Sequence, residues 1–397
     1  MTMKPFEHHD FPAPPEDLAD FRAELAAWLD AHHDELAPKF EQPGELEEHV
    51  EQMQRVKRML WDAGFMQCGW PERVGGRGGS PMMRIELGAQ IAARDYADPG
   101  LFSLIEVLAP TVIDYAPTEL AAEMIPLLLS GTEMWCQGFS EPGSGSDLAS
   151  LSCRATPKDG DAESAKTWVV NGQKVWTSLA QHSERCVLLT RTGTPESRHR
   201  GITAFFVDMD TPGISIAPLE MMNGELEFAE VFFDNVEVPA ERIFGGVSGG
   251  WAVAMSILPY ERSSCFWQRI GYLYTRLQKL VAVAPTDDRA AEAIGESYAE
   301  LHALRSRSRM TQHRLANEGT IGADTSIDKV LIAAAEQHLF DTARKLLPGV
   351  VEFDDSPDGQ SWRLEYLYSR ASSIYGGTGE VQRDIISKRL LDLGDFR

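Results

Sequence analysis

The 397-residue sequence predicts an α+β protein that is mainly α, with a helical domain on each side of a central β domain. Two observations predict this order. In both end regions apolar residues recur every three or four positions, the spacing of a helix that buries one face. Between residues 135 and 239 the period gives way to short β-branched and aromatic runs separated by turn residues, which is typical of strands. We predict domains over 1–132, 133–241 and 242–397.

Amphipathic helices account for the N-terminal domain. The first is predicted over residues 14–36 and the second over 44–63, where Gly64 supplies a stop signal. Helical patterns then continue over 82–129, with interruptions near Asp98-Pro99-Gly100 and Ala116-Pro117.

Strands account for the middle domain. An Asn171-Gly172 pair inside the first run favours a type I′ turn, so we expect that run to fold as a hairpin. The runs with strand composition span 168–178, 186–192, 202–210 and 230–238. Together they predict a compact β domain.

Helices return after Gly249. Their patterns cover 249–282, 288–317, 324–347 and 361–391. Before the last of them, residues 353–359 form a short acidic loop. The spans are long enough for a C-terminal helical bundle.

Acidic residues outnumber basic ones by 60 to 37, which gives a formal net charge of −23. A protein this negative repels phosphate backbones, so its composition argues against nucleic-acid binding. An anionic ligand would need basic side chains or backbone donors in its site to overcome the same field.

The five cysteines are scattered without a C-x-x-C pair, and the ten histidines show no ligand spacing. We therefore expect free thiols in a reducing compartment and no metal site. No apolar run approaches the length of a membrane span, and the first ten residues lack the apolar core of a signal peptide. The sequence thus predicts a cytoplasmic protein.

One stretch presents backbone and small polar groups where a core would place apolar residues. It covers residues 135–147 and reads WCQGFSEPGSGSD. Glycines there let N–H groups approach a polar ligand closely. Together with Trp176 and Ser178 at the end of the 168–178 run, Ser140 could line one side of a planar ligand.

These two segments resemble the acyl-CoA dehydrogenase family, and further motifs follow in the family's order. They are WPERVGG at 70–76, GELEFAEVFFDNVEVP at 224–239, YER at 260–262 and SIYGGTGEVQRDII at 373–386. Each motif alone is weak, whereas the ordered set covers nearly the whole chain. The resemblance implies a β-barrel-like middle domain and a C-terminal four-helix bundle.

By this resemblance, the chain binds FAD and converts an acyl-CoA thioester to the trans-2-enoyl-CoA, with flavin N5 as the hydride acceptor. Ser140 and Ser178 would hydrogen-bond the flavin ring and Trp176 would pack against it. The full set of implied cofactor-binding residues is Phe139, Ser140, Gly145, Ser146, Trp176, Ser178, Thr378 and Glu380.

The catalytic base departs from the better-known family pattern. Many members carry a glutamate directly before the Gly-Thr pair of the C-terminal motif, and here that position is Gly376. In isovaleryl-CoA and long-chain type enzymes the glutamate instead precedes an arginine on an earlier helix, which matches Glu261-Arg262. We therefore predict Glu261, flanked by apolar and small residues, as a partly buried base. The N–H of Gly376 would polarise the thioester carbonyl.

Assembly and electron acceptor stay open at this stage. Many relatives use an Arg-x-x-Phe-Gly motif to reach the FAD of an adjacent subunit, and residues 268–285 lack it. The resemblance implies a homodimer or homotetramer, with a heterotetramer as the alternative, and an electron-transfer flavoprotein as acceptor. An acyl-CoA oxidase using oxygen and a non-catalytic structural subunit are the rival functions. Straight, branched and ring-bearing acyl groups all fit the sequence.

Overall fold

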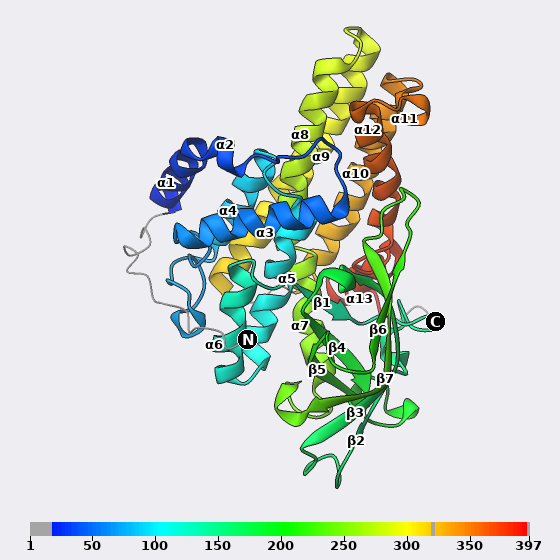
Figure 1. Ribbon diagram of the computed structural model, residues 1–397. Coiled ribbons are helices and arrows are strands. Elements are labelled where there is room, and N and C mark those ends of the chain that lie inside the picture. The colour runs from blue at the N-terminus through cyan, green and yellow to red at the C-terminus, as the bar shows by residue number, and fades with distance from the viewer. Residues whose placement is uncertain (1–17, 319–321, 395–397) are drawn as a thin grey trace.

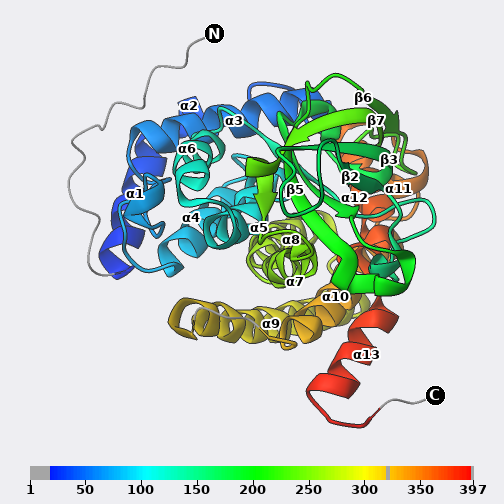
Figure 2. The same cartoon turned by 90° about the horizontal axis from the view of Figure 1, so that it is seen from below.

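The computed structural model describes residues 18–318 and 322–394, and Figure 1 shows their elements in three parts. Helices coloured blue to cyan form one part, the green sheet the second, and helices coloured yellow to red the third. Viewed from below in Figure 2, α8 (Ser264–Val283) runs through the centre, packed against helices of both helical parts. The predicted α+β, mainly α class is confirmed. The predicted start of the first helix, at residue 14, and the first ten residues lie outside the described residues.

The N-terminal helices follow the sequence pattern. They are α1 (Leu18–Ala31), α2 (His33–Leu36), α3 (Leu46–Asp62), α4 (Met82–Ala93), α5 (Pro99–Tyr115) and α6 (Thr118–Leu129). The predicted interruption near Asp98 is the capped start of α5, because Asp98 Oδ1 accepts the N–H of Leu101 at 3.0 Å and Pro99 opens the first turn. This cap fixes Asp98 at the edge of the cavity described below.

The middle part is one sheet. Its strands are β1 (Trp135–Gly138), β2 (Arg154–Pro157), β3 (Thr167–Ser178), β4 (Arg185–Arg191), β5 (Ile202–Asp208), β6 (Ile214–Leu219), β7 (Phe228–Pro239) and β8 (Ile243–Phe244). In the described residues they are ordered β6-β7-β3-β2-β4-β5-β8, and β1 pairs with β4 in parallel.

The predicted hairpin at Asn171-Gly172 is wrong, because β3 continues through the pair as a single strand. There Gly172 has a φ of +148° and the register against β7 shifts, so the glycine makes a bulge where a turn was predicted. Asn171 Oδ1 accepts the N–H of Asn235 at 2.9 Å and so joins the two strands at this point.

The C-terminal helices break twice where continuous helices were predicted. The elements are α7 (Gly250–Glu261), α8, α9 (Asp288–Glu318), α10 (Thr325–Leu346), α11 (Val350–Phe353), α12 (Pro357–Tyr368) and α13 (Gly379–Arg389). One break falls at Ser263, whose φ and ψ of −126° and −75° leave the helical region. The other falls at Gly376 and Gly377, which have φ values of +62° and +88°. Both breaks place predicted active-site residues at helix ends.

The core of the N-terminal part extends across the domain borders. Val253, Ala254 and Ile257 of α7 belong to the same buried cluster as the N-terminal helices and the buried faces of β4 and β5. Helix α7 is therefore held rigidly, and Glu261 at its end has a fixed position. Every helix in the described part of the chain is too short or too polar to cross a membrane.

Candidate active site

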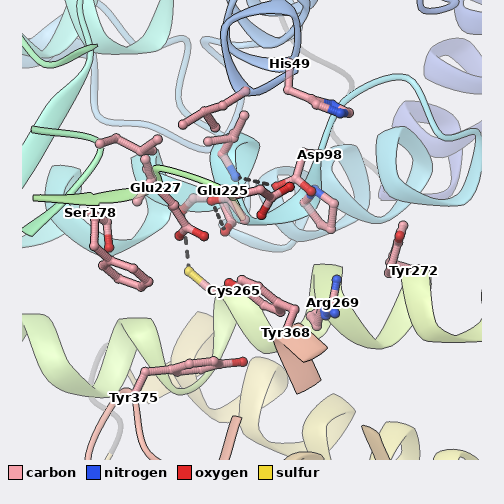
Figure 3. A pocket seen from close by; sticks show the side chains of 18 of the residues that line it. His49, Asp98, Ser178, Glu225, Glu227, Cys265, Arg269, Tyr272, Tyr368 and Tyr375 are labelled. Atoms are coloured by element: carbon pink, nitrogen blue, oxygen red, sulfur yellow. Dashed lines mark hydrogen bonds between the residues drawn. The ribbon is translucent and has the colours of Figure 1, made fainter. Parts of the chain in front are cut away.

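A cavity of about 280 Å³ opens where the three parts meet. Its lining comes from the start of α5, from β1, from residues 223–228 that lead into β7, and from α8 and α12 (Figure 3). Two sequence-predicted site residues, Glu261 and Ser178, lie in this lining. Tyr375, the neighbour of Gly376, lines it as well.

Glu261 and Gly376 face each other across the break that ends α7. A Cβ built on Gly376 would lie 3.1 Å from Glu261 Oε1, so the two positions converge on one point although 114 residues of chain separate Arg262 from Gly376. Arg262 donates from Nε to the carbonyl oxygen of Gly376 at 2.7 Å and ties the two segments together. Glu261 is half-buried, as predicted from its flanks.

A buried cation stands beside this pair. Lys329 of α10 is 1% exposed, donates to the carbonyl oxygen of Ser372 and lies 4.3 Å from the ring centre of Tyr375. Burial lowers the pKa of Lys329 to about 8, and the negative charge of Glu261 opposes that shift. The ammonium and the Glu261 carboxylate therefore attract each other. Sequence analysis missed Lys329, since a lone lysine in a helix pattern reads as a surface residue.

The residues predicted to form a flavin wall lie close together at the end of β3. The N–H of Val175 donates to the carbonyl oxygen of Ser140 at 2.9 Å, which brings the 139–147 loop alongside Trp176 and Ser178. Trp176 has a φ of +59° and sits in a register shift, with its indole 61% exposed and edge-on to Phe228. An exposed indole held by backbone geometry is available to a ligand.

Two buried polar atoms beside this wall have no hydrogen-bond partner within the described residues. They are Thr177 Oγ1 and Gln137 Oε1. Buried polar atoms without a partner are uncommon in folded proteins, and a ligand with hydrogen-bonding edges would satisfy them. A flavin ring has such edges, so the residues present fit that cofactor.

A buried ion pair supports the 139–147 loop from beneath. Lys174 is fully buried and donates from Nζ to Glu141 at 2.8 Å and to the carbonyl oxygen of Phe139 at 3.1 Å. Burial acts to raise the pKa of Glu141, but Lys174 and the N–H groups of Ser152 and Cys153 outweigh it and hold the pKa below its usual value. Phe139 itself is 7% exposed and packs into the core.

The remaining predicted cofactor residues lie outside the cavity lining. Gly145 and Ser146 are exposed, and a Cβ on Gly145 would meet no atom within 4 Å. Thr378 caps α13 by accepting the N–H of Val381 at 3.3 Å, and Glu380 is exposed in the first turn of that helix. None of these four residues lines the cavity.

Three carboxyl groups, which sequence analysis did not single out, face the cavity in Figure 3: Asp98, Glu225 and Glu227. Glu225 accepts from Asn223 Nδ2 at 2.7 Å. The described residues offer the Glu227 carboxyl neither a hydrogen bond nor an ion pair. Burial, followed by the charges of Asp98 and Glu225, raises the pKa of Glu227 to about 8.

The basic side of the cavity is already paired. Arg269 of α8 makes ion pairs with Glu336 at 2.6 Å and with Glu365 at 2.8 Å, and Tyr272 donates to Glu365. Arg276 also lines the cavity and reaches Asp95 at 3.2 Å. The charges on this side satisfy one another, unlike Glu227.

Domain models of acyl-CoA dehydrogenases match nearly the whole chain. The N-terminal domain model matches residues 15–132, the middle domain model 136–236 and the C-terminal domain model 248–391. The chain belongs to the acyl-CoA dehydrogenase family. It is an oxidoreductase that acts on CH–CH groups, and its family typically binds FAD.

Relatives of this acyl-CoA dehydrogenase align over almost its full length. The acyl-CoA dehydrogenase IpdE1 of Mycobacterium tuberculosis is 37% identical over 394 residues, covering 95% of this chain and 98% of that protein. Among solved structures, the Tcur3481-Tcur3483 steroid ACAD has a TM-score of 0.80 at 26% identity, covering 96% and 98%. The ChsE4-ChsE5 complex from Mycobacterium tuberculosis has a TM-score of 0.76 at 25% identity, covering 95% and 98%.

Proposed function

We propose that this acyl-CoA dehydrogenase oxidises an acyl-CoA thioester to the trans-2-enoyl-CoA, with Glu261 as general base and FAD as cofactor. The observation that carries the proposal is the convergence of Glu261 and Gly376, 3.1 Å from carboxylate oxygen to built Cβ, at the wall of one cavity. A base and a backbone donor at the same point suit removal of a proton beside a thioester carbonyl.

The cofactor side of the proposal rests on residues of this chain. One wall of the proposed flavin site consists of Trp176, Ser178 and the backbone of Ser140. Thr177 Oγ1 and Gln137 Oε1 have no hydrogen-bond partner within the described residues and are proposed to bond to the flavin. Glu380, Thr378, Gly145 and Ser146 are proposed to hold the rest of the cofactor. When bound, FAD supplies the redox chemistry by accepting hydride from the substrate β-carbon.

The chain's own residues have three tasks in this reaction. Glu261 takes the α-proton, and the rigid packing of α7 keeps its carboxylate in place. The N–H of Gly376 makes no hydrogen bond within the described backbone, so it is free to polarise the thioester carbonyl. Arg262 donates to the carbonyl oxygen of Gly376 at 2.7 Å and thereby fixes the residue that carries this N–H.

The relatives inform the substrate and assembly parts of the proposal. One solved relative, Tcur3481-Tcur3483, is a steroid ACAD whose name joins two chains, and another is the ChsE4-ChsE5 complex. We propose that this chain also takes a bulky ring-bearing acyl group and assembles with a second, related chain as a heterotetramer. An electron-transfer flavoprotein is the proposed acceptor.

The test is an anaerobic titration of the purified protein with a panel of acyl-CoA thioesters, followed by the visible absorbance of oxidised flavin. Bleaching by one thioester would support both the cofactor and the dehydrogenation. A flavin-loaded protein that no thioester bleaches would contradict the proposed reaction, and reoxidation by oxygen at catalytic rates would favour an oxidase.

Glu261→Gln tests the base. We expect single-turnover bleaching to slow by about 10²–10⁴-fold while flavin content stays constant, because only the proton acceptor is lost. Glu241→Gln, an exposed glutamate after β7, is the control and should keep the wild-type rate. Wild-type bleaching by Glu261→Gln would remove Glu261 from the mechanism.

A further inference from the structure

The cavity that receives the acyl group in the proposed function carries carboxyl groups that a hydrocarbon chain cannot pair with. Its lining combines apolar residues such as Leu104, Leu108 and Phe266 with the carboxyl groups of Asp98, Glu225 and Glu227. Pockets for hydrocarbon chains gain affinity from apolar walls, and a carboxyl group left without a partner there weakens binding. The acidic lining therefore calls for a ligand that hydrogen-bonds to it.

Of these three carboxyl groups, that of Glu227 is the one without a hydrogen-bond or ion-pair partner within the described residues. Asp98 is occupied as the cap of α5 and Glu225 by the side chain of Asn223. Glu227 enters the cavity beside Ser178 in Figure 3, and its backbone carbonyl is anchored by the N–H of Leu179 at 2.7 Å. Its carboxyl is thus positioned by the sheet but left for a ligand.

The groups around Glu227 indicate which chemical group of a substrate can bind beside it. A carboxylate or a CoA phosphate would be repelled by Asp98 and Glu225, so this wall belongs to the acyl end of the substrate. An ammonium group has three donors and no acceptor, so it would leave the O–H of a protonated Glu227 without a partner. A neutral oxygen meets neither penalty.

We propose that Glu227 is a specificity-determining residue that donates a hydrogen bond to a neutral keto or hydroxyl oxygen on the acyl group. This inference rests on the proposed function, since it takes the cavity as the acyl site. A carboxylic acid that keeps its proton at neutral pH is a strong donor, and burial favours the protonated form of Glu227. The acyl group is accordingly an apolar body that carries at least one oxygen remote from the thioester.

The experiment compares three thioesters with one skeleton: cyclohexylpropanoyl-CoA, its ring-keto derivative and its ring-amino derivative. For the flavin-loaded protein we expect kcat/KM to be at least about tenfold higher for the keto compound than for the hydrocarbon, because a buried donor without a partner disfavours the latter. Glu227→Leu should bring that ratio to within about twofold of one. Glu227→Gln should keep part of it, since its amide still donates.

Glu230→Gln is the matched control, because Glu230 lies three residues further along, pairs with Gln173 at 2.7 Å and does not line the cavity. It should keep the wild-type ratio. A wild-type ratio near one, a preference for the amino compound, or a preference that survives Glu227→Leu would overturn the proposal. Even if a variant fails to fold, a wild-type ratio of kcat/KM near one between the keto compound and the hydrocarbon would refute the proposal.

Calorimetric binding of the same thioesters separates this inference from the proposed reaction. Flavin that bleaches equally with the keto and hydrocarbon compounds would leave the reaction intact and refute the role of Glu227. A keto preference in binding that Glu227→Leu abolishes, with no bleaching by any thioester, would support the role of Glu227 and refute the reaction.

Discussion

Replacing Gly376 with alanine should slow single-turnover flavin bleaching by about tenfold while costing little stability. The added Cβ would lie 3.1 Å from Glu261 Oε1 and 3.5 Å from Lys329 Cε, and the first contact is a few tenths of an ångström too close. The Glu261 carboxylate therefore has to move away from the thioester. Since a displacement of 1 Å in an active site costs about a hundredfold in rate, a smaller one is consistent with about tenfold.

The same substitution has a separate backbone cost, because Gly376 has a φ of +62°. An L-residue in the left-handed region loses about 1 kcal/mol, which in a chain of 397 residues lowers Tm by only about 1 °C. Gly246→Ala isolates this cost, since Gly246 has a φ of +80° and a Cβ there would meet no atom within 4 Å.

Stopped-flow bleaching with the best thioester and thermal unfolding are the two assays. Both alanine variants should lose about the same stability, about 1 kcal/mol, and only Gly376→Ala should lose rate. A Gly376→Ala enzyme that bleaches as fast as Gly246→Ala would refute the geometry assigned to the base.

Three further predictions concern the walls of the site. Lys174→Met should destabilise the fold by about 3–5 kcal/mol, measured by urea unfolding, because it leaves the Glu141 carboxylate buried without its cation; a loss below 1 kcal/mol would contradict the supporting role of the pair. Trp176→Ala should weaken FAD retention on gel filtration and barely change the unfolding of the flavin-free chain, since the indole is 61% exposed; unchanged retention would exclude Trp176 as the flavin wall. Burial, with neighbouring carboxyl groups, raises the pKa of Glu227 from 4.5 to about 8, so its contribution to stability is present below pH 4.5 and is lost as the pH rises through 8. Glu227→Gln should remove about 3.5 kcal/mol of that pH dependence in urea unfolding between pH 5 and pH 8, and an unaltered pH profile would count against a raised pKa.

Periodicity predicted the order of the three parts because each helix and strand buries one face. It failed where the helices break, since Ser263 and Gly376 interrupt patterns whose apolar spacing continues on both sides. At Asn171-Gly172 the local turn preference was outweighed by pairing with β7 along twelve residues of β3. Local signals thus gave the elements, while long-range pairing decided where they end.

Motif resemblance identified Glu261 and Gly376 as candidates, and the structure adds their convergence, which spacing along the chain cannot give. It could not find Lys174, Lys329 or Glu227. Charged residues are expected at the surface, and only tertiary packing shows that these three enter the interior. The one local sign that was available concerns Lys174, which lies inside a run of strand-forming residues.

The Glu261 carboxylate occupies the space that a side chain at position 376 would enter. A glutamate at 376 would start its Cβ 3.1 Å from the existing carboxylate and would then crowd a second negative charge against the first. A form carrying a glutamate at both positions would therefore bear the cost of this crowding and of the repulsion between two carboxylates. Relocating the base is easiest when its loss at one position and its gain at the other occur together.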